Sequence, residues 1–323
     1  MALTILNQLT ALVCGGVGIS IATRRLKQVF VLLGRPNETL RLKKVIAAAR
    51  ARSHTALNSR GTIKYIGDYL SLRFTRQERF KSIEHHYDFL RKKASGVRIT
   101  DGLTLWCSID DEGRTHDLIM QSSSMAPMEG ETELCFRLDR ERLFTLTFSI
   151  VDGGIIGCDE TAVVFVGGVQ GAYFGQDRVR YSARKNDEIA PITILLLAVS
   201  AIADVFGIRT IVGTSNRSQV SSLKSVDGRS ASLNYDGLWQ RYGGVEDGRG
   251  HFLTPVSAST DVKNDVSGKH RARTRRRRKR RIEIMAGMFR NVATALDSDA
   301  VSHCDPFLGR IRHEEDREVS VSA

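Results

Sequence analysis

The chain has 323 residues, of which 41% are apolar and 26% charged, with five Cys and five Pro. This composition excludes collagen-like, disulfide-scaffold and wholly disordered proteins. The formal net charge is +12, but it is unevenly distributed. Residues 24–95 carry +13, residues 96–268 carry −7, residues 269–281 carry +10 and residues 282–323 carry −4.

The first 23 residues contain no charged side chain. Basic residues follow this stretch, whereas a secretory signal has them before its apolar part, and its three glycines make a poor membrane-spanning helix. We therefore expect residues 1–23 to be an uncharged, loosely docked leader, with a membrane-associated N-terminus as the alternative. A second apolar run, residues 189–206, contains Pro191 and Asp204, so we expect a buried helix there.

Residues 24–95 have the pattern of a basic helical region. Apolar residues fall on one helical stripe between residues 26 and 33. Thr75 followed by Glu78 is typical of a capping box, because each side chain can accept an unpaired N–H of the first helical turn. An apolar face over residues 80–90 continues that second helix.

From residue 96 the apolar period changes to two, which is typical of strands. Five short runs separated by turns predict an antiparallel meander, at residues 103–109, 116–121, 133–138, 142–150 and 162–166. The helix over 189–206 ends at Gly207 and precedes a strand over 208–212, so strand, helix and strand form a βαβ crossover with one parallel pair. A short helix over 235–242 and a last strand over 251–256 complete the sheet domain.

The basic run at 269–281 passes without a breaker into an apolar segment, so we expect one basic helix within 261–296. Residues 297–323 are acidic and aperiodic, and we expect a disordered tail. The predicted fold class is α+β. It has a basic helical N-terminal region packed on a mixed, mostly antiparallel sheet domain over 96–260, followed by the basic C-terminal helix. The order of elements in the sheet domain is similar to that of GNAT acyltransferases.

Residues 167–171 (GGVQG) directly follow the fifth predicted strand. Glycine there lets backbone N–H groups approach a ligand closely, which makes Gly168, Gln170 and Gly171 candidates for ligand binding. The motif matches neither the P-loop nor the dinucleotide fingerprint. A β-bulge or a tight turn at a sheet edge is the structural alternative.

Ser215 and Asn216 follow the strand after the crossover helix, where α/β folds place ligands, and they are candidates for catalysis. A helix cap or Asx turn is the alternative. Asp236 is a third catalytic candidate as a general base, or only a helix N-terminal charge. Tyr235 and Trp239 share a helix face and are ligand candidates, although this spacing is more typical of core. No cluster has metal-ligand spacing, so no metal and no cofactor are predicted.

An anionic partner is expected for the basic run, because ten like charges without an acid repel one another in an isolated helix. The candidate contacts are Arg275, Arg276, Arg277, Arg278, Lys279, Arg280 and Arg281. An anionic membrane surface or another polyanion is the expected partner. Nucleic acid is less favoured, and a solvated helix face is the remaining alternative. The sequence does not identify a small-molecule ligand.

Three segments resemble the VirK/YbjX family of bacterial proteins: VVFVGGVQG at 163–171, ILLLAVSAIADVFGIRTIVGTSNRSQV at 194–220 and LNYDGLWQRYGG at 233–244. The basic segment at 263–281 and EHHYDFL at 84–90 are also similar to parts of the family pattern. The chain departs from it at Gln219, where the family often has His, and at 186–191, where a basic approach to the crossover helix is usual. Any ligand role of those family residues is therefore in doubt here.

The resemblance implies a protein of a Gram-negative bacterium that is linked to virulence, envelope stress and tolerance of antimicrobial peptides, without an established activity. Five cysteines with no C-x-x-C pair favour a reducing compartment. We therefore expect a cytoplasmic protein, peripheral at the inner membrane, that binds an anionic surface. The alternative is a GNAT-like acyltransferase that uses acyl-CoA or an acyl carrier protein, although the phosphate-binding loop of those enzymes is absent before residues 189–206.

Overall fold

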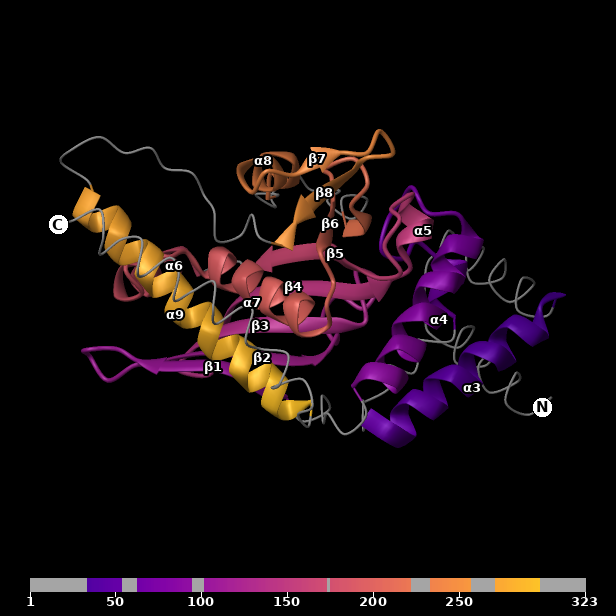
Figure 1. Cartoon of the computed structure of the whole chain (residues 1–323), viewed down its shortest axis with the longest axis horizontal. Helices are drawn as coiled ribbons and strands as arrows, with labels where there is room; N and C mark the ends of the chain where they lie inside the picture. The colour runs from indigo at the N-terminus through magenta and orange to yellow at the C-terminus, as the bar shows by residue number, and fades with distance from the viewer. Residues whose placement is uncertain are drawn as a thin grey trace, which may run out of the picture.

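One eight-stranded sheet forms the centre of the computed structural model, with strand order β1-β2-β3-β4-β5-β6-β8-β7 (Figure 1). The strands are β1 (Leu103–Ile109), β2 (Thr115–Ser122), β3 (Thr132–Leu138), β4 (Glu141–Val151), β5 (Val163–Gly171), β6 (Thr210–Thr214), β7 (Val245–Glu246) and β8 (His251–Pro255). β1 to β5 form an antiparallel meander, and β5 and β6 are parallel. β8 pairs antiparallel with β6 and β7. The predicted α+β class with a mixed, mostly antiparallel sheet is confirmed.

The described residues form seven α-helices and one 3-10 helix around this sheet. They are α3 (Pro36–Ser53), the 3-10 helix η1 (Lys64–Ile66), α4 (Arg76–Lys93), α5 (Gly153–Ile156), α6 (Gln176–Lys185), α7 (Pro191–Val205), α8 (Tyr235–Arg241) and α9 (Arg271–Ala295). The capping box predicted for α4 is confirmed: the Glu78 amide donates to Thr75 Oγ1 at 3.3 Å, and the Thr75 amide donates to Glu78 Oε2 at 2.7 Å.

The structure describes residues 34–53, 63–94, 102–172, 175–221, 233–256 and 271–296. The leader expected over 1–23, the stripe over 26–33 and the tail over 297–323 lie outside the described residues. The domain boundaries given above stay predictions.

Alternating side chains of the central strands build two apolar cores. In β5, Val164 and Val166 pack with α7 and α9, whereas Val163 and Phe165 pack with α3 and α4. This is the period of two expected for a strand buried on both faces. The crossover from β5 to β6 runs through α6 and the almost fully buried α7.

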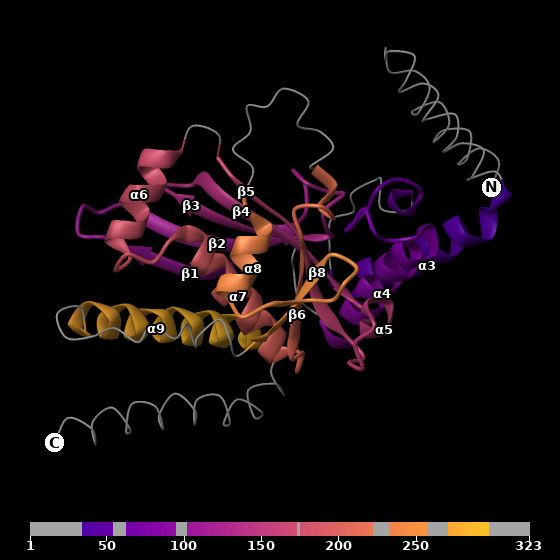
Figure 2. The ribbon, with the colours of Figure 1, turned by 90° about the horizontal axis from the view of Figure 1, so that it is seen from above.

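Two described basic segments, α3 and the first half of α9, lie far apart. The basic first half of α9 is at one end of the molecule and α3 is at the other, in both views (Figures 1 and 2). They therefore do not form one continuous basic surface.

The glycine motif at 167–171 is not a loop after the fifth strand, as one interpretation of the sequence had it. All five residues belong to β5, which extends to Gly171. Thr147 pairs with Gly168 and Phe148 with Val166, so Gly167 is a bulged residue. The predicted β-bulge is therefore present, but β5 lies between β4 and β6 and not at a sheet edge.

Candidate functional site

The basic residues of α9 occupy its first half, and the second half is apolar. Met285, Met288, Phe289 and Val292 are buried in the core that α7 and the sheet share. Burying four large apolar side chains contributes several kcal/mol, at roughly 1.5–3 kcal/mol for each. The apolar half thus fixes the position of the whole helix, including its charged half.

One face of the basic half contacts the loop between α6 and α7. Arg276 Nε lies 2.7 Å from Asp187 Oδ1, and Arg273 Nη2 lies 3.5 Å from Glu188 Oε2. Arg277 Nη2 donates to the backbone carbonyl of Glu188 at 3.0 Å. Asp187 and Glu188 have φ values of 53° and 61°, a left-handed conformation that is costly for residues other than glycine. These contacts tie the loop to α9 and pair Arg273 and Arg276 with carboxylates.

Two further predicted contact residues also face the protein. Arg280 Nη2 donates to Ser108 Oγ at 3.3 Å, and its Nη1 lies 3.5 Å from Glu283 Oε2. Arg281 is half-buried, and this burial lowers the pKa of its guanidinium. Of the seven residues predicted to meet an anionic partner, Arg276, Arg277, Arg280 and Arg281 thus have intramolecular surroundings. Arg275 and Arg278 also have interactions within the chain, so these contacts do not by themselves decide which of the seven residues meets a partner.

The other three predicted residues are exposed. Arg275, Arg278 and Lys279 lie three and four positions apart, so the helical period places them on neighbouring parts of one surface. We call these three side chains the outward basic face of α9. The helical period therefore places these three side chains away from the α6–α7 loop that Arg273, Arg276 and Arg277 contact, although Arg276 is itself 67% exposed.

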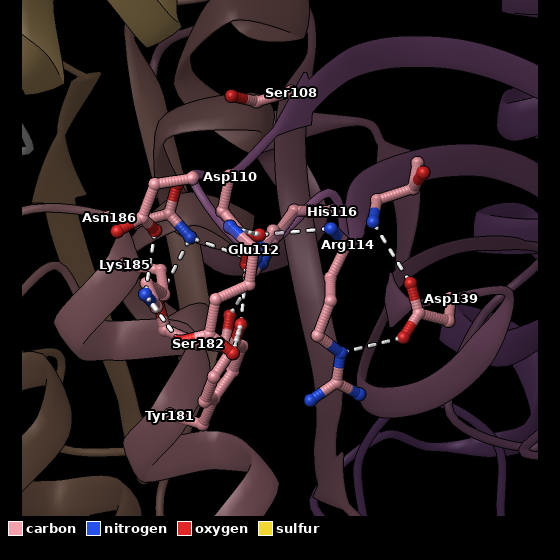
Figure 3. Close-up of polar contacts among 12 residues, drawn as sticks. Ser108, Asp110, Glu112, Arg114, His116, Asp139, Tyr181, Ser182, Lys185 and Asn186 are labelled. Carbon is pink, nitrogen blue, oxygen red and sulfur yellow. Dashed lines mark hydrogen bonds and ion pairs between the residues drawn. The ribbon is translucent and has the colours of Figure 1, made fainter.

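A polar cluster supports the region beneath the basic half by joining the β1–β2 turn to α6 (Figure 3). The His116 ring lies between Asp110 and Ser182, with Nε2 at 2.9 Å from Asp110 Oδ2 and Nδ1 at 3.1 Å from Ser182 Oγ. The Tyr181 ring stacks on the His116 ring at 6.3 Å between centroids. Asn186, which begins the loop that α9 contacts, donates through Nδ2 to His116 Nδ1 at 3.2 Å.

Charged groups of the β1–β2 turn complete this cluster. Lys185 Nζ lies 2.6 Å from carboxylate oxygens of both Asp111 and Glu112, and these two contacts raise the pKa of its ammonium group. Burial opposes ionisation of Asp110, but hydrogen bonds from His116, the Arg114 amide and the Tyr181 hydroxyl outweigh it and hold the pKa of Asp110 well below its usual range. Partial burial, with the hydrogen bonds to Asp110 and Glu112, raises the pKa of Tyr181 to about 12.

Sequence reasoning missed this cluster and a second one of the same composition. His251 Nδ1 lies 3.0 Å from Asp247 Oδ2, and His251 Nε2 lies 2.9 Å from Ser71 Oγ. This is the order of contacts in a Ser-His-Asp triad. However, Ser71 and His251 are fully buried, and the rings of Phe74 and Phe165 pack edge-on against the imidazole. Because no substrate reaches the hydroxyl, we assign this group to fixing β8 against the segment before α4.

The predicted site residues of the sheet domain do come together, at the carboxyl ends of β5 and β6. The Tyr235 hydroxyl donates to the Val169 carbonyl at 3.0 Å and accepts from the Val169 amide at 2.9 Å. The Tyr235 amide donates to Asn216 Oδ1 at 2.8 Å, and the Asn216 amide donates to Asp236 Oδ1 at 2.9 Å. α8 therefore links the strand with the glycines to the loop of Ser215 and Asn216.

A buried carboxylate that the sequence did not single out lies in this region. Glu129 Oε2 accepts from Gln170 Nε2, and Glu129 Oε1 accepts from Gln219 Nε2, both at 3.0 Å. A Cβ atom on Gly167 would overlap the Glu129 carbonyl, and one on Gly168 would overlap its carboxylate. The two glycines therefore allow Glu129 to lie directly on β5, which is a packing reason for the motif.

The remaining candidates of this region have structural partners. Ser215 is buried, and its hydroxyl lies 3.1 Å from Ser218 Oγ in a closed turn. Trp239 is buried, and its Nε1 donates to the Thr214 carbonyl at 2.9 Å, over a glycine at position 213 that leaves room for the ring. Gly171 lies against the Phe144 ring. Catalytic and ligand roles for these residues stay predictions, and their contacts favour the cap, turn and core alternatives.

Comparison with known proteins identifies the family. Residues 18–288 match the family described as "Protein of unknown function (DUF535)". The chain belongs to this family. Among curated proteins it is similar to "Uncharacterized protein YbjX" of Escherichia coli (strain K12), with 24% identity over 235 residues that cover 69% of this chain and 70% of that protein. The resemblance to the VirK/YbjX family is therefore confirmed, whereas no solved structure matches the chain.

These findings leave the biochemical activity of the family open. They do not support the acyltransferase alternative, and the GNAT-like order stays unconfirmed. None of the helices in the described ranges combines the length and apolar character that crossing a bilayer requires. Within the same ranges, no three His, Cys, Asp or Glu side chains form a group suited to a metal ion.

Proposed function

We propose that the protein binds an anionic membrane surface through the outward basic face of α9. The observation that carries this proposal is the division of the helix. The apolar second half is anchored in the core, so the continuous helix sets the orientation of the first half, and the exposed contacts to Asp187 and Glu188 add a little to it. A rigidly held helix therefore presents Arg275, Arg278 and Lys279 to the solvent.

Electrostatics sets the expected strength of this contact. A basic side chain near an anionic leaflet contributes about 1 kcal/mol, so three side chains contribute about 3 kcal/mol. This attraction acts within a Debye length and weakens as salt rises. The binding we propose is therefore peripheral and reversible.

We place this contact at the inner face of the cytoplasmic membrane and link it to envelope integrity and virulence. The family resemblance supports this placement, and it is the reason to prefer a membrane over nucleic acid. The basic residues of α3 lie at the opposite end of the molecule and do not contribute to the same contact (Figure 2).

Co-sedimentation with vesicles tests the proposal. The variant R275Q/R278Q/K279Q removes the outward basic face, and R41Q/K43Q/K44Q removes the same charge from α3 as a matched control. Wild type and the control should sediment with vesicles that contain about one third phosphatidylglycerol at low salt, and the α9 variant should bind about a hundredfold more weakly. No protein should sediment with neutral phosphatidylcholine vesicles.

Two results would contradict the proposal. In one, the α3 variant loses as much vesicle binding as the α9 variant, which would indicate a non-specific effect of charge. In the other, a DNA duplex displaces the vesicles at equal phosphate concentration, which would identify nucleic acid as the partner. In cells, resistance of a deletion strain to a cationic antimicrobial peptide should be restored by wild type and by the α3 variant, but not by the α9 variant.

A further inference from the structure

Arg281, in the middle of α9, has a guanidinium group that contacts no hydrogen-bond acceptor among the described residues. Its Nε atom is buried and unpaired, whereas its Nη atoms stay open to solvent. Arg277, one helical turn earlier, also has a buried and unpaired Nε atom, and its Nη2 atom donates to the Glu188 carbonyl at 3.0 Å. A guanidinium has five N–H donors, and a buried donor without an acceptor is costly. Two neighbouring arginines are thus incompletely satisfied by the protein.

The charges of these two arginines are also poorly compensated. The two acids of the α6–α7 loop pair with Arg273 and Arg276 instead. Burial is the main cause that lowers the pKa of Arg281, and the positive charge of Arg277 adds to it. Both effects disfavour a positive charge at this place. An anion that contacted both guanidinium groups would relieve their repulsion and accept from their open N–H groups.

The start of α7 adds positive potential at the same place. The carbonyl that accepts from Arg277 lies three residues before Pro191, the first residue of α7. Tyr242, which interacts electrostatically with Arg281, donates its hydroxyl proton to Thr193 Oγ1 at 3.0 Å in the first turn of α7. That turn has no acidic side chain, and its N-cap residue forms no side-chain cap. The arginines supply the donors, and the helix end favours negative charge beside them.

Two guanidinium groups one turn apart suit a phosphate better than a carboxylate. Residues four positions apart on a helix have Cβ atoms roughly 6 Å apart, so both side chains can reach one small anion. A single guanidinium fork occupies both oxygens of a carboxylate, whereas a phosphate has oxygens for two forks. We propose that Arg277 and Arg281 together bind one phosphate group through their Nη atoms, where α9 packs against the start of α7 (Figures 1 and 2).

This phosphate site is distinct from the outward basic face. At 3.6 residues per turn, the pair lies about a third of a turn around the axis of α9 from Arg275, Arg278 and Lys279. The outward face acts through its net charge, whereas the phosphate site acts through donors in a fixed arrangement. Failure of either proposal leaves the other unaffected.

Nuclear magnetic resonance of the arginine Nε–H groups tests the site in the full-length protein at pH 7. The Nε atoms of Arg277 and Arg281 are shielded from water, which slows the exchange of their protons. Sodium phosphate should shift both signals saturably. Sodium acetate at the same ionic strength should bind at least about tenfold more weakly, because it fills one fork only.

Two variants with the same change of charge test the assignment, with the Arg277 signal as the readout. R281Q should weaken phosphate binding at least about tenfold, because it removes a charged donor group. R290Q removes one positive charge from an exposed position of the same helix and should bind phosphate as wild type does. R281K keeps the charge but not the fork, so its affinity should lie between those of wild type and R281Q.

A short-chain lipid distinguishes the two sources of a phosphate group. Dihexanoylphosphatidic acid that binds at least about tenfold more tightly than inorganic phosphate assigns the site to a lipid headgroup. A smaller difference assigns it to soluble phosphate compounds.

Three results would overturn the proposal. These are no saturable shift of either signal with phosphate or with the lipid, equal binding of phosphate and acetate, and equal phosphate binding by R281Q and R290Q. If R281Q does not fold, R281K decides in its place, since phosphate binding as tight as that of wild type would exclude a role for the Arg281 fork.

Discussion

The two ends of the molecule use charge in different ways. At the α3–α4 end, Lys64 Nζ lies 3.0 Å from both carboxylate oxygens of Glu131, and the two side chains are 1% and 3% exposed. The Tyr87 hydroxyl donates to the same carboxylate at 2.7 Å. At the α9 end, the paired arginines Arg273 and Arg276 are 55% and 67% exposed.

The difference shows that burial, and not the number of ion pairs, decides what a charge contributes to stability. A buried charge that loses its partner pays the full cost of desolvation. An exposed pair exchanges a protein partner for water and loses little. At the α3–α4 end, loss of one member of the Lys64–Glu131 pair therefore destabilises the fold strongly. At the α9 end, the exposed charges can exchange an internal partner for water or for an external partner at little cost in stability.

The largest effect is expected from E131Q, which removes the charge but not the volume. Lys64 would then be buried without a counter-charge, and the free energy of unfolding should fall by about 3–5 kcal/mol. E112Q at the exposed pair with Lys185 is the matched control and should lower the stability far less than E131Q does. Urea denaturation measures both values.

The double variant K64M/E131L sharpens this result. It removes both charges together, and it should be more stable than E131Q because no charge is left unpaired. Equal stability of E131Q and E112Q would show that the two ends do not differ in the way described.

Acidification should destabilise the α3–α4 end first. The pKa of His86 is about 4 in the folded protein against an ordinary value of 6.5, because the ring is buried. Between these pH values the unfolded chain binds a proton that the folded chain does not, so stability falls as pH falls, by about 3 kcal/mol over the window. Burial lowers the pKa values of His85 and His251 also, which adds to the effect.

The α9 end responds at lower pH. The hydrogen bonds to Asp110 keep its pKa below the ordinary 3.8, so their stabilisation is present above that pH and is lost only below it. Urea unfolding of wild type and H86N at pH 7, 5.5 and 4.5 measures the window of His86. The curve of H86N should be flatter, and an unchanged slope would exclude this histidine as the cause.

The smallest effect is expected from R273Q and R276Q. Each removes one exposed pair with the α6–α7 loop and should lower the free energy of unfolding by less than about 1 kcal/mol, with a smaller loss at high salt. Thermal unfolding at two salt concentrations measures this. If either variant lowered the free energy of unfolding as much as E131Q does, the contacts between α9 and the α6–α7 loop would be as important for stability as the buried Lys64–Glu131 pair.

Much of the fold was predictable because local patterns determine it. The apolar period of two predicted the antiparallel meander of β1 to β5. The long apolar run predicted the crossover helix α7 and therefore the parallel pair of β5 and β6. The capping box at Thr75 marked the start of α4. These features depend on neighbouring residues, whose spacing is written directly in the sequence.

The site was less predictable because its contacts join distant residues. Glu129 lies in a turn whose sequence indicates exposure, and its partner Gln219 is 90 residues away. The sequence signal was the pair of glycines at 167 and 168. They indicate that another group packs closely on the backbone, but they do not identify that group as Glu129. The contact between His116 and Asp110 could have been predicted, because a β1–β2 hairpin brings residues that are six positions apart close together.

α9 also protects an edge of the sheet. Among the described strands β1 pairs with β2 alone, and a bulge leaves Leu105 outside the ladder. Asn291 Nδ2 donates to the Leu105 carbonyl at 2.9 Å, so a helix side chain takes the place of a neighbouring strand. Uncovered strand edges are templates for association with other chains. We therefore expect the helix that carries the basic residues to limit self-association as well, and a partner that lifts it from the sheet to expose an edge prone to aggregation.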